Sequence, residues 1–409
     1  MKNQAATTPA RPGRKGAFLG LAALAAAGLA AAFLWPSPDP NVLARRAGDA
    51  FMARDFASAE ADLARVHRIR PPTPLDHMLE GQLAIVNGRP DEALAALDRV
   101  PDDYPMAAQA RLQAGQLELR RSRYSAAERH FLEAVRLDPK SVQARRELIY
   151  IYGMQLRRAD LGRTFRDLSA LAPLKYAEVF LWCLSRGVTW EAAEIVETLK
   201  KCLEADPTDR WSRLGLAEGL RDLSRPEEAE AALASLPNSD PLARAARVRI
   251  ALDLGEDQQA EALLAEGPAD DLDLALLRGR FAQARGDLAE AARLFRIAYQ
   301  KAPHLREPVL GLGQALRASG DLDAAAPLLE EAGRHEQLGS LIQRAAVEQN
   351  RDDPALMNDL GDACLALGRF AEARSWYNLA VTRDPLDARA QSGLARVRDQ
   401  EPNPADAPG

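Results

Sequence analysis

A proline recurs every 34 residues through the first part of the chain, and this period constrains the fold more than any other feature. The prolines in this series are Pro71, Pro105, Pro139, Pro173, Pro207 and Pro241. A fixed period of about 20 to 50 residues is typical of a solenoid, in which each repeat is one supersecondary unit. Proline lacks a backbone N–H and disfavours helical geometry in the residue before it. We therefore expect each proline to follow the second helix of a two-helix repeat.

Small and bulky residues occur at fixed offsets from these prolines. With each proline at position 32, repeats begin at residues 40, 74, 108, 142, 176 and 210. Small residues occupy position 8 (Gly81, Gly115) and position 20 (Ala59, Ala93, Ala127, Ala229), whereas position 24 carries Leu63, Leu97, Phe131, Phe165, Leu199 and Leu233. Small side chains let two helices of a hairpin pack closely. The bulky residue is expected to fill the space towards the neighbouring repeat.

This pattern resembles the tetratricopeptide repeat, in which Trp-x2-Leu-Gly-x2-Tyr is followed by Ala-x3-Phe and then Pro. The match is clearest from residue 354, where Leu360, Gly361, Ala373, Tyr377 and Pro385 fit the pattern. The resemblance covers residues 40 to about 400. It implies an all-α, right-handed superhelical solenoid of about ten helix–turn–helix repeats.

The register becomes irregular after Pro241. The pattern predicts a short repeat from residue 244, repeats from 272 and 306, an extra helix over 340–353 and a last repeat from 354. The solenoid is thus expected over residues 40–387. A capping helix over 388–400 would give the array a polar end, and residues 401–409 are expected to form a disordered tail.

The amino terminus has the composition of a membrane anchor. Residues 1–15 contain four basic residues and no acidic one, and the run 17–35 contains 19 uncharged residues. At about 1.5 Å per residue this run would span a bilayer as one helix. The alternative is a secretory signal cleaved after the small residues Ala30–Ala32. Residues 36–39 would form a proline-rich linker.

The orientation of this anchor follows from its charge. Basic flanks stay in the cytoplasm, so residues 1–15 are expected there and the solenoid on the other side. The high alanine and arginine content is typical of a bacterium with a GC-rich genome. We therefore expect a single-pass inner-membrane protein with a periplasmic solenoid; secretion after signal cleavage is the alternative.

The sequence contains no recognisable catalytic or metal-binding motif. Cys183, Cys202 and Cys364 form no zinc spacing, and the five histidines are scattered one to a repeat. Cys183 and Cys202 share a hairpin at offsets too distant for a disulfide, so both are expected to be buried packing residues. The net charge of −6 does not favour nucleic-acid binding. We expect no enzyme activity, no cofactor, no metal and no small-molecule substrate.

The resemblance instead implies a scaffold that binds a partner protein or peptide in the concave groove of the superhelix. The alternative is an accessory component of an envelope polysaccharide, lipopolysaccharide or secretion machine that acts with an enzyme. In the family the first helix of each repeat lines the groove through positions 2, 5, 9, 12 and 13. The residues carried over as the candidate site are Gln116, Arg120, Arg146, Tyr150, Phe180 and Trp211, and the same register includes Gly153, Met154 and Leu184.

Charge is distributed unevenly along the repeats. Residues 108–166 contain 13 basic and 6 acidic residues, whereas residues 225–273 contain 4 and 12. These charges are either the solvated outer faces of helices or a field that orients a charged partner. The sequence leaves both interpretations open.

Overall fold

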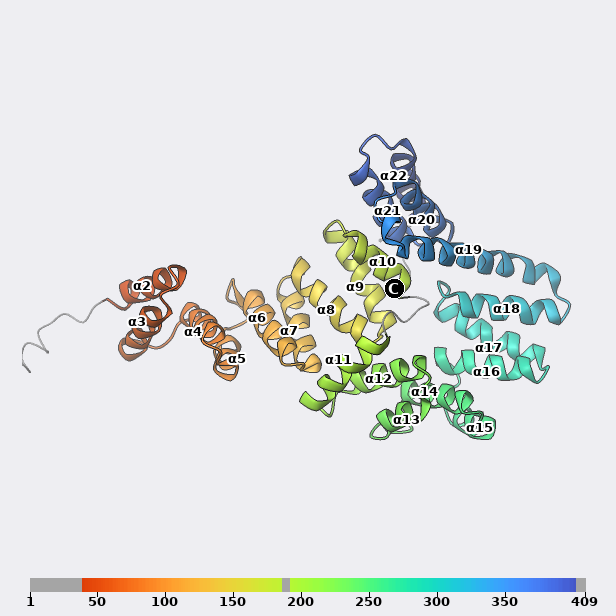
Figure 1. The fold of residues 1–409 in the computed structure, drawn as a ribbon, viewed down its shortest axis with the longest axis horizontal. Coiled ribbons are helices and arrows are strands. Elements are labelled where there is room, and N and C mark those ends of the chain that lie inside the picture. The colour runs from red at the N-terminus through yellow and green to blue at the C-terminus, as the bar shows by residue number, and fades with distance from the viewer. Residues whose placement is uncertain (1–38, 186–191, 402–409) are drawn as a thin grey trace, which may run out of the picture. The chain divides into compact units, whose positions relative to one another are not determined.

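The computed structural model describes residues 39–185 and 192–401, and every regular element in them is helical. Within these residues, twenty-one α-helices, α2 to α22, and the 3₁₀ turn η1 (Glu348–Asn350) follow one another (Figure 1). The predicted all-α array of helical hairpins is confirmed for this part of the chain. The predicted anchor at 17–35 lies outside the described residues. Among the helices described, none combines the length and apolar character that a membrane span requires.

The chain forms two compact units, and the first ends at Val100. It contains α2 (Pro40–Met52), α3 (Phe56–Ile69), α4 (Pro74–Val86) and α5 (Pro90–Asp98). Its core includes Ala47, Ala59, Leu63 and Leu83. The buried carboxylate of Asp62 on α3 pairs with Arg46 on α2, so the first hairpin is held by charge as well as by apolar packing.

The second unit begins at Pro101 and contains the other helices. Its first six helices are α6 (Ala107–Arg120), α7 (Tyr124–Leu137), α8 (Val142–Met154), α9 (Arg158–Leu171), α10 (Tyr176–Leu184) and α11 (Ala192–Ala205). They are followed by α12 (Arg210–Asp222), α13 (Pro226–Leu233), α14 (Pro241–Asp253), α15 (Asp257–Ala265), α16 (Leu272–Ala284) and α17 (Leu288–Lys301). The last five are α18 (Arg306–Ala318), α19 (Leu322–Ala346), α20 (Pro354–Ala366), α21 (Phe370–Arg383) and α22 (Ala388–Gln400).

Close packing within a hairpin follows the predicted offsets. A Cβ added to Gly115 would lie 2.5 Å from the ring of Phe131, and one on Gly361 would lie 2.6 Å from the ring of Tyr377. Both rings are fully buried. In these two repeats glycine is therefore required at position 8, because the position-24 side chain of the same repeat occupies the space that a side chain would need.

The turn between the two helices of a repeat places one residue in the left-handed region. These residues, all at position 15, are Arg54, Gly88, Ser122, Leu156, Ser224, Gly255, Gly286, Gly320 and Gly368. Gly255 follows Pro241 by the same interval that separates Gly88 from Pro74. The seventh repeat thus begins at Pro241, three residues before the predicted start at 244.

The helix ends differ from the predictions in two further places. Helices α5 and α13 have only 9 and 8 residues, so both end well before the proline that was expected to mark the helix end. Pro105 therefore lies within the connection after α5, and Pro241 opens α14. Proline is well accommodated in the first turn of a helix, where its missing N–H is not needed. The helix predicted separately over 340–353 is instead the end of α19, which runs unbroken to Ala346 because Gln337 stands where a proline would have ended it.

The stack of repeats divides after α9. Helix α10 packs on α9, α19 and α21, whereas α11 contacts α8 and continues the array through α12. Figure 1 shows α10 beside the helices of the last repeat. The ring of Tyr176 on α10 meets Trp376 on α21 edge-on at 5.6 Å, and its hydroxyl donates to the carbonyl of Ala345 at 2.8 Å. Residues of the third to fifth repeats and of the last repeat therefore share one apolar core.

A buried polar joint fixes the other branch. Gln155, which ends α8, donates through Nε2 to Asp209 and Ser212 at 3.1 and 3.2 Å. All three side chains are buried, and Asp209 also caps the start of α12. Such a network is stabilising only when its members are satisfied, so it specifies how α12 sits on α8.

Candidate functional site

A cavity of about 230 Å³ opens where the stack divides. It lies among α8, α9, α10 and α11 and is lined by Ile149, Tyr150, Gly153, Met154, Leu156, Arg158, Leu161, Leu181, Leu184, Ser185, Glu194 and Ile195. Most of this lining is apolar. The cavity exists because α10 turns towards α21 and leaves the face of α8 incompletely covered. We call it the α8 pocket.

Tyr150 is the aromatic residue that lines this pocket. Its side chain is 47% exposed and meets the ring of Tyr124 edge-on at 6.1 Å, with the two hydroxyl oxygens 3.3 Å apart. Tyr124 is buried at the start of α7, and burial raises its pKa. Tyr150 is thus held in place by a neutral buried partner. A fixed ring that is partly open to water is a typical contact surface in protein interfaces.

Gly153 gives the pocket its depth. It lies one helical turn after Tyr150 on α8, and no atom lies within 4 Å of the Cβ position that another residue would have. Glycine in a helix interior lowers helix stability by about 1 kcal/mol relative to alanine. No neighbouring atom requires a glycine at this position, so the missing side chain simply leaves free space on the α8 surface.

Charged side chains border the apolar lining. Arg158 is half-exposed and lies 4.0 Å from the carboxylate of Glu218 on α12. Burial acts to raise the pKa of Glu218, but Arg249, Arg221 and Arg158 outweigh it and hold the pKa below its ordinary value. Glu218 is therefore ionised and neutralises arginines near the pocket.

Three polar members of the predicted groove lie on α6 and α8. Gln116 donates to Glu147 at 2.9 Å, and Arg146 donates through Nε to Glu178 of the next repeat at 2.7 Å. Both side chains therefore connect neighbouring first helices. Arg120 is exposed and has no ion pair among the residues that the structure describes.

The other two predicted residues pack between helices. Phe180 is half-buried and stacks on Tyr176 at 6.2 Å, next to the contact between α10 and α21. Trp211 is half-buried with the guanidinium carbons of Arg157 and Arg210 at 4.2 and 4.4 Å from its ring centroid. Of the six predicted residues, Tyr150 alone lines the α8 pocket.

Sequence reasoning also placed Gly153, Met154 and Leu184 on the groove, and all three line the pocket. It gave no indication of Leu156, Leu161 or Ile195, because these side chains belong to the turn and second helices. They face the cavity only because α10 departs from the regular stack.

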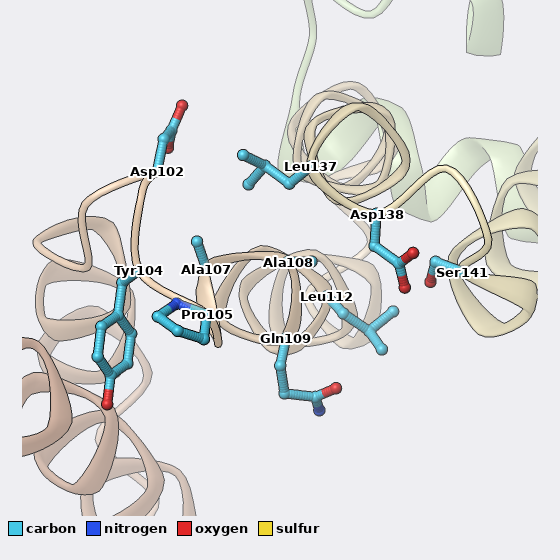
Figure 2. Close-up of a pocket in the computed structure, with 10 residues that line it drawn as sticks. All are labelled: Asp102, Tyr104, Pro105, Ala107, Ala108, Gln109, Leu112, Leu137, Asp138 and Ser141. Atoms are coloured by element: carbon cyan, nitrogen blue, oxygen red, sulfur yellow. The ribbon is translucent and has the colours of Figure 1, made fainter.

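A second cavity of about 320 Å³ lies at the start of the second unit (Figure 2). Its acidic groups are already engaged in the structure. Asp102 pairs with Arg111 and Arg136, and Asp138 accepts from the backbone N–H of Lys140. Ser141 caps α8. These groups hold helix ends and connections, so we do not place the candidate site there.

The structure brings together two cysteines that the sequence did not connect. Cys183 and Cys364 approach each other beside Glu372. Cys202 lies elsewhere, buried near Asp209, where burial raises its thiol pKa to about 12. All three cysteines are free thiols and buried, as predicted for Cys183 and Cys202.

Comparison with known proteins follows the repeat pattern. One family model described as Tetratricopeptide repeat matches residues 78–149 and 341–388, and a second with the same description matches 191–249 and 282–346. Together these matches cover more than half of the chain. A sequence search of curated proteins found none that matches the chain.

The solved structures that match the chain are distant in sequence. A human IFIT1 dimer with PPP-AAAA is 16% identical, with 86% of this chain and 84% of that chain covered and a TM-score of 0.34. A tetratricopeptide repeat protein from Parabacteroides merdae is 17% identical, with 56% and 92% covered and a TM-score of 0.29. Part of a repeat-containing protein from Cytophaga hutchinsonii is 12% identical, with 66% and 98% covered and a TM-score of 0.31.

Proposed function

Because the chain belongs to the tetratricopeptide-repeat family, whose members generally mediate protein–protein interactions, we propose that it is a non-catalytic scaffold that binds a partner protein through the α8 pocket. The observation that carries this proposal is the apolar cavity beside the half-exposed ring of Tyr150. Exposed aromatic and apolar surface of this kind marks contact sites on soluble proteins.

The size of the pocket favours a side chain as its occupant. Pockets for small molecules usually have volumes of about 300 to 1,000 Å³, whereas the α8 pocket has about 230 Å³. One bulky aliphatic or aromatic side chain of a partner segment would fill it. An anchor residue of this kind typically supplies much of the binding energy of an interface.

The surrounding charge indicates the composition of the partner segment. The pocket belongs largely to the basic stretch 108–166, which has 13 basic and 6 acidic residues. Arg120 is exposed without an ion pair in the described part of the chain, whereas Arg158 in the pocket wall lies 4.0 Å from the carboxylate of Glu218. We therefore propose a partner segment with net negative charge around its apolar anchor.

The location of the scaffold is a separate proposal that rests on the amino-terminal sequence alone. Residues 17–35 would anchor the chain in the inner membrane of a bacterium, with the repeats on the periplasmic side. In that setting the partner would be an envelope protein.

The binding test uses Gly153, because a side chain there would fill the pocket without a clash at its first atom. Peptides that bind the purified chain are first selected from a displayed random library. Their affinity is then measured for Gly153→Leu and for the control Gly333→Leu, since Gly333 is exposed, lies within α19 and also has no neighbour around its Cβ position. Both changes remove a helix glycine and should leave folding intact or improved.

We expect Gly153→Leu to weaken peptide binding at least about tenfold, because the anchor side chain loses its place. The control should bind as the wild type does, and the selected peptides should be rich in bulky apolar and acidic residues. Equal affinity of the two variants for the selected peptides would refute the proposed site.

A further inference from the structure

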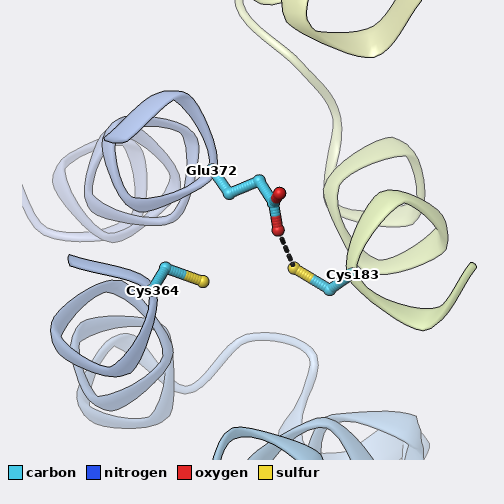
Figure 3. Close-up of side chains that lie close together, drawn as sticks. All are labelled: Cys183, Cys364 and Glu372. Carbon is cyan, nitrogen blue, oxygen red and sulfur yellow. Dashed lines mark hydrogen bonds between the residues drawn. The ribbon is translucent and has the colours of Figure 1, made fainter. Parts of the chain in front are cut away.

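Two thiols and a carboxylate meet inside the contact between α10 and the last repeat. Cys183 comes from the end of α10, Cys364 from the last turn of α20 and Glu372 from the first turn of α21 (Figure 3). All three side chains are buried, at 2%, 0% and 2% exposure. Their donor atoms, two Sγ and one carboxylate oxygen, all lie within 4.8 Å of one another.

We propose that Cys183, Cys364 and Glu372 bind one divalent metal ion of the zinc type. Thiolate and carboxylate donors together suit a borderline ion such as Zn²⁺, and they do not suit Mg²⁺ or Ca²⁺, which prefer oxygen ligands. Each thiol releases its proton to solvent when its sulfur binds the ion. The spacing of the cysteines along the sequence does not predict this site, because its ligands come from distant repeats.

The distances fit such an ion with small movements. In a tetrahedral site with Zn–S bonds of about 2.3 Å and Zn–O bonds of about 2.1 Å, a thiolate sulfur lies about 3.6 Å from a carboxylate oxygen and about 3.8 Å from a second sulfur. The Cys183 Sγ lies 3.3 Å from Oε2 of Glu372. Figure 3 shows the Cys364 and Cys183 side chains directed into the same space from opposite helices. All three donor atoms lie within 4.8 Å of one another, which is close to the separations of the bonding geometry.

Neighbouring groups balance the charge that the bound ion would bring. Arg369, the N-cap residue of α21, is buried and pairs with Glu372. Two thiolates, one carboxylate, one guanidinium and one divalent ion sum to zero charge, which is the condition for burying ions in a core. The indole N–H of Trp376 also donates to Cys183 Sγ at 3.3 Å, a contact typical of the groups that orient metal ligands.

One coordination position would go to a ligand from solvent. Zinc in proteins is usually four-coordinate, so a water molecule would complete a site that has three protein ligands. Arg369 Nε is buried without a hydrogen-bond partner in the described part of the chain, so a donor is available beside the cluster for an added acceptor.

The consequence of binding is mechanical. The ligands belong to α10 on one side and to α20 and α21 on the other, and Cys183 and Glu372 are 189 residues apart along the chain. A bound ion would fasten the last repeat to the fifth. None of the three ligands lines the α8 pocket, although α10 carries Cys183 as well as Leu181 and Leu184 of the pocket wall.

The experiment measures metal binding by the full chain, purified in mild detergent with its thiols reduced. Zn²⁺ is titrated against a chromophoric chelator, and Co²⁺ is titrated to record the absorption bands of a tetrahedral thiolate complex. We expect one ion per chain, cobalt bands typical of thiolate ligation, and slower amide hydrogen exchange in α10 and α21 when the ion is bound.

The variants are Cys183→Ser, Cys364→Ser and Glu372→Gln, with Cys202→Ser as the matched control, because Cys202 is also buried and free but lies outside the cluster. Loss of either sulfur ligand should weaken Zn²⁺ binding about 100-fold or more, since even groups behind the ligands contribute about 10- to 100-fold. Glu372→Gln is nearly isosteric and its amide oxygen can still accept from Arg369, so it is the variant used if a serine variant does not fold. The control should bind like the wild type.

Three results would overturn the proposal. The first is absence of Zn²⁺ binding by the reduced wild-type chain. The second is that Glu372→Gln and at least one folded serine variant both bind Zn²⁺ with wild-type affinity. The third is a Cys183–Cys364 disulfide in protein purified without reductant, which would identify the pair as a redox pair.

Discussion

Arg157 lies where the array of repeats continues from α8 to α12, and its side chain contacts several of the helices that meet there. Its side chain is only 8% exposed and donates to Glu128 at 2.7 Å and to Asp160 at 2.8 Å. Its guanidinium carbon also lies 4.3 Å from the ring centroid of Tyr152 and 4.2 Å from that of Trp211. One side chain therefore connects α7, α8, α9 and α12.

We predict that Arg157→Ala destabilises this joint by about 3 to 5 kcal/mol, the usual cost of breaking a buried ion pair by removing one partner. Each lost cation–π contact is expected to account for about 0.5 to 2 kcal/mol of that total. Arg157→Lys should retain the charge and lose the paired hydrogen bonds, so its cost should be smaller. Arg158→Ala is the control, because the neighbouring arginine is half-exposed, and we expect a change of about 0 to 1 kcal/mol.

Repeat arrays can open locally, so the assay must resolve position. Urea unfolding gives the total free energy of unfolding, and native-state hydrogen exchange shows which helices lose protection. We expect the end of α8 and the start of α12 to open first in Arg157→Ala. A change no larger than that of Arg158→Ala, or a loss of protection confined to α9, would refute this account of the joint.

Three further predictions concern the turns, the pocket border and the membrane topology. Ser122→Gly and Ser224→Gly should each stabilise the chain by about 0.5 to 1 kcal/mol in urea unfolding, because serine is strained in the left-handed region that glycine adopts freely; a loss of stability would count against the assigned turn geometry. Glu218→Gln should cost about 1 to 3 kcal/mol at pH 7, because it leaves arginines unpaired. The folded-state pKa of Glu218 is lowered, so this stability is fully present above the unfolded pKa and is lost as pH falls through the folded pKa; a difference from wild type that persists in strong acid contradicts the assignment. A reporter that is active only in the cytoplasm should be silent when fused after Gly409, and an active fusion would show that the predicted orientation is wrong.

The repeat fold was predictable because its determinants are local. In the third repeat, for example, a small residue at position 8 packs against a bulky one at position 24, and this pair, Gly115 and Phe131, lies within 16 residues of sequence. The irregular parts were harder to predict, because there the local signals disagree with one another. The position of Gly255 reveals the start of the seventh repeat at Pro241, but the proline series alone assigns Pro241 to a helix end.

The candidate site was only partly predictable. Tyr150 and Gly153 follow from the groove register on α8, whereas the second wall of the pocket depends on where α10 goes. That path is set by the contact of Tyr176 with Trp376, which lies in a repeat far along the chain. A periodic pattern carries no information about such a contact, so neither the pocket nor the meeting of Cys183 with Glu372 could be read from the sequence.

Contact of a partner protein with the α8 pocket can be detected directly by site-specific photo-crosslinking in the producing cells. A photoreactive benzoyl-phenylalanine replaces Tyr150 in one strain and Leu322, which is 63% exposed on α19, in another. We expect a discrete adduct with one partner from position 150, which is absent from position 322 and is lost when Gly153→Leu is added. No adduct from position 150, or an adduct that persists with Gly153→Leu, would show that the partner does not bind at the α8 pocket.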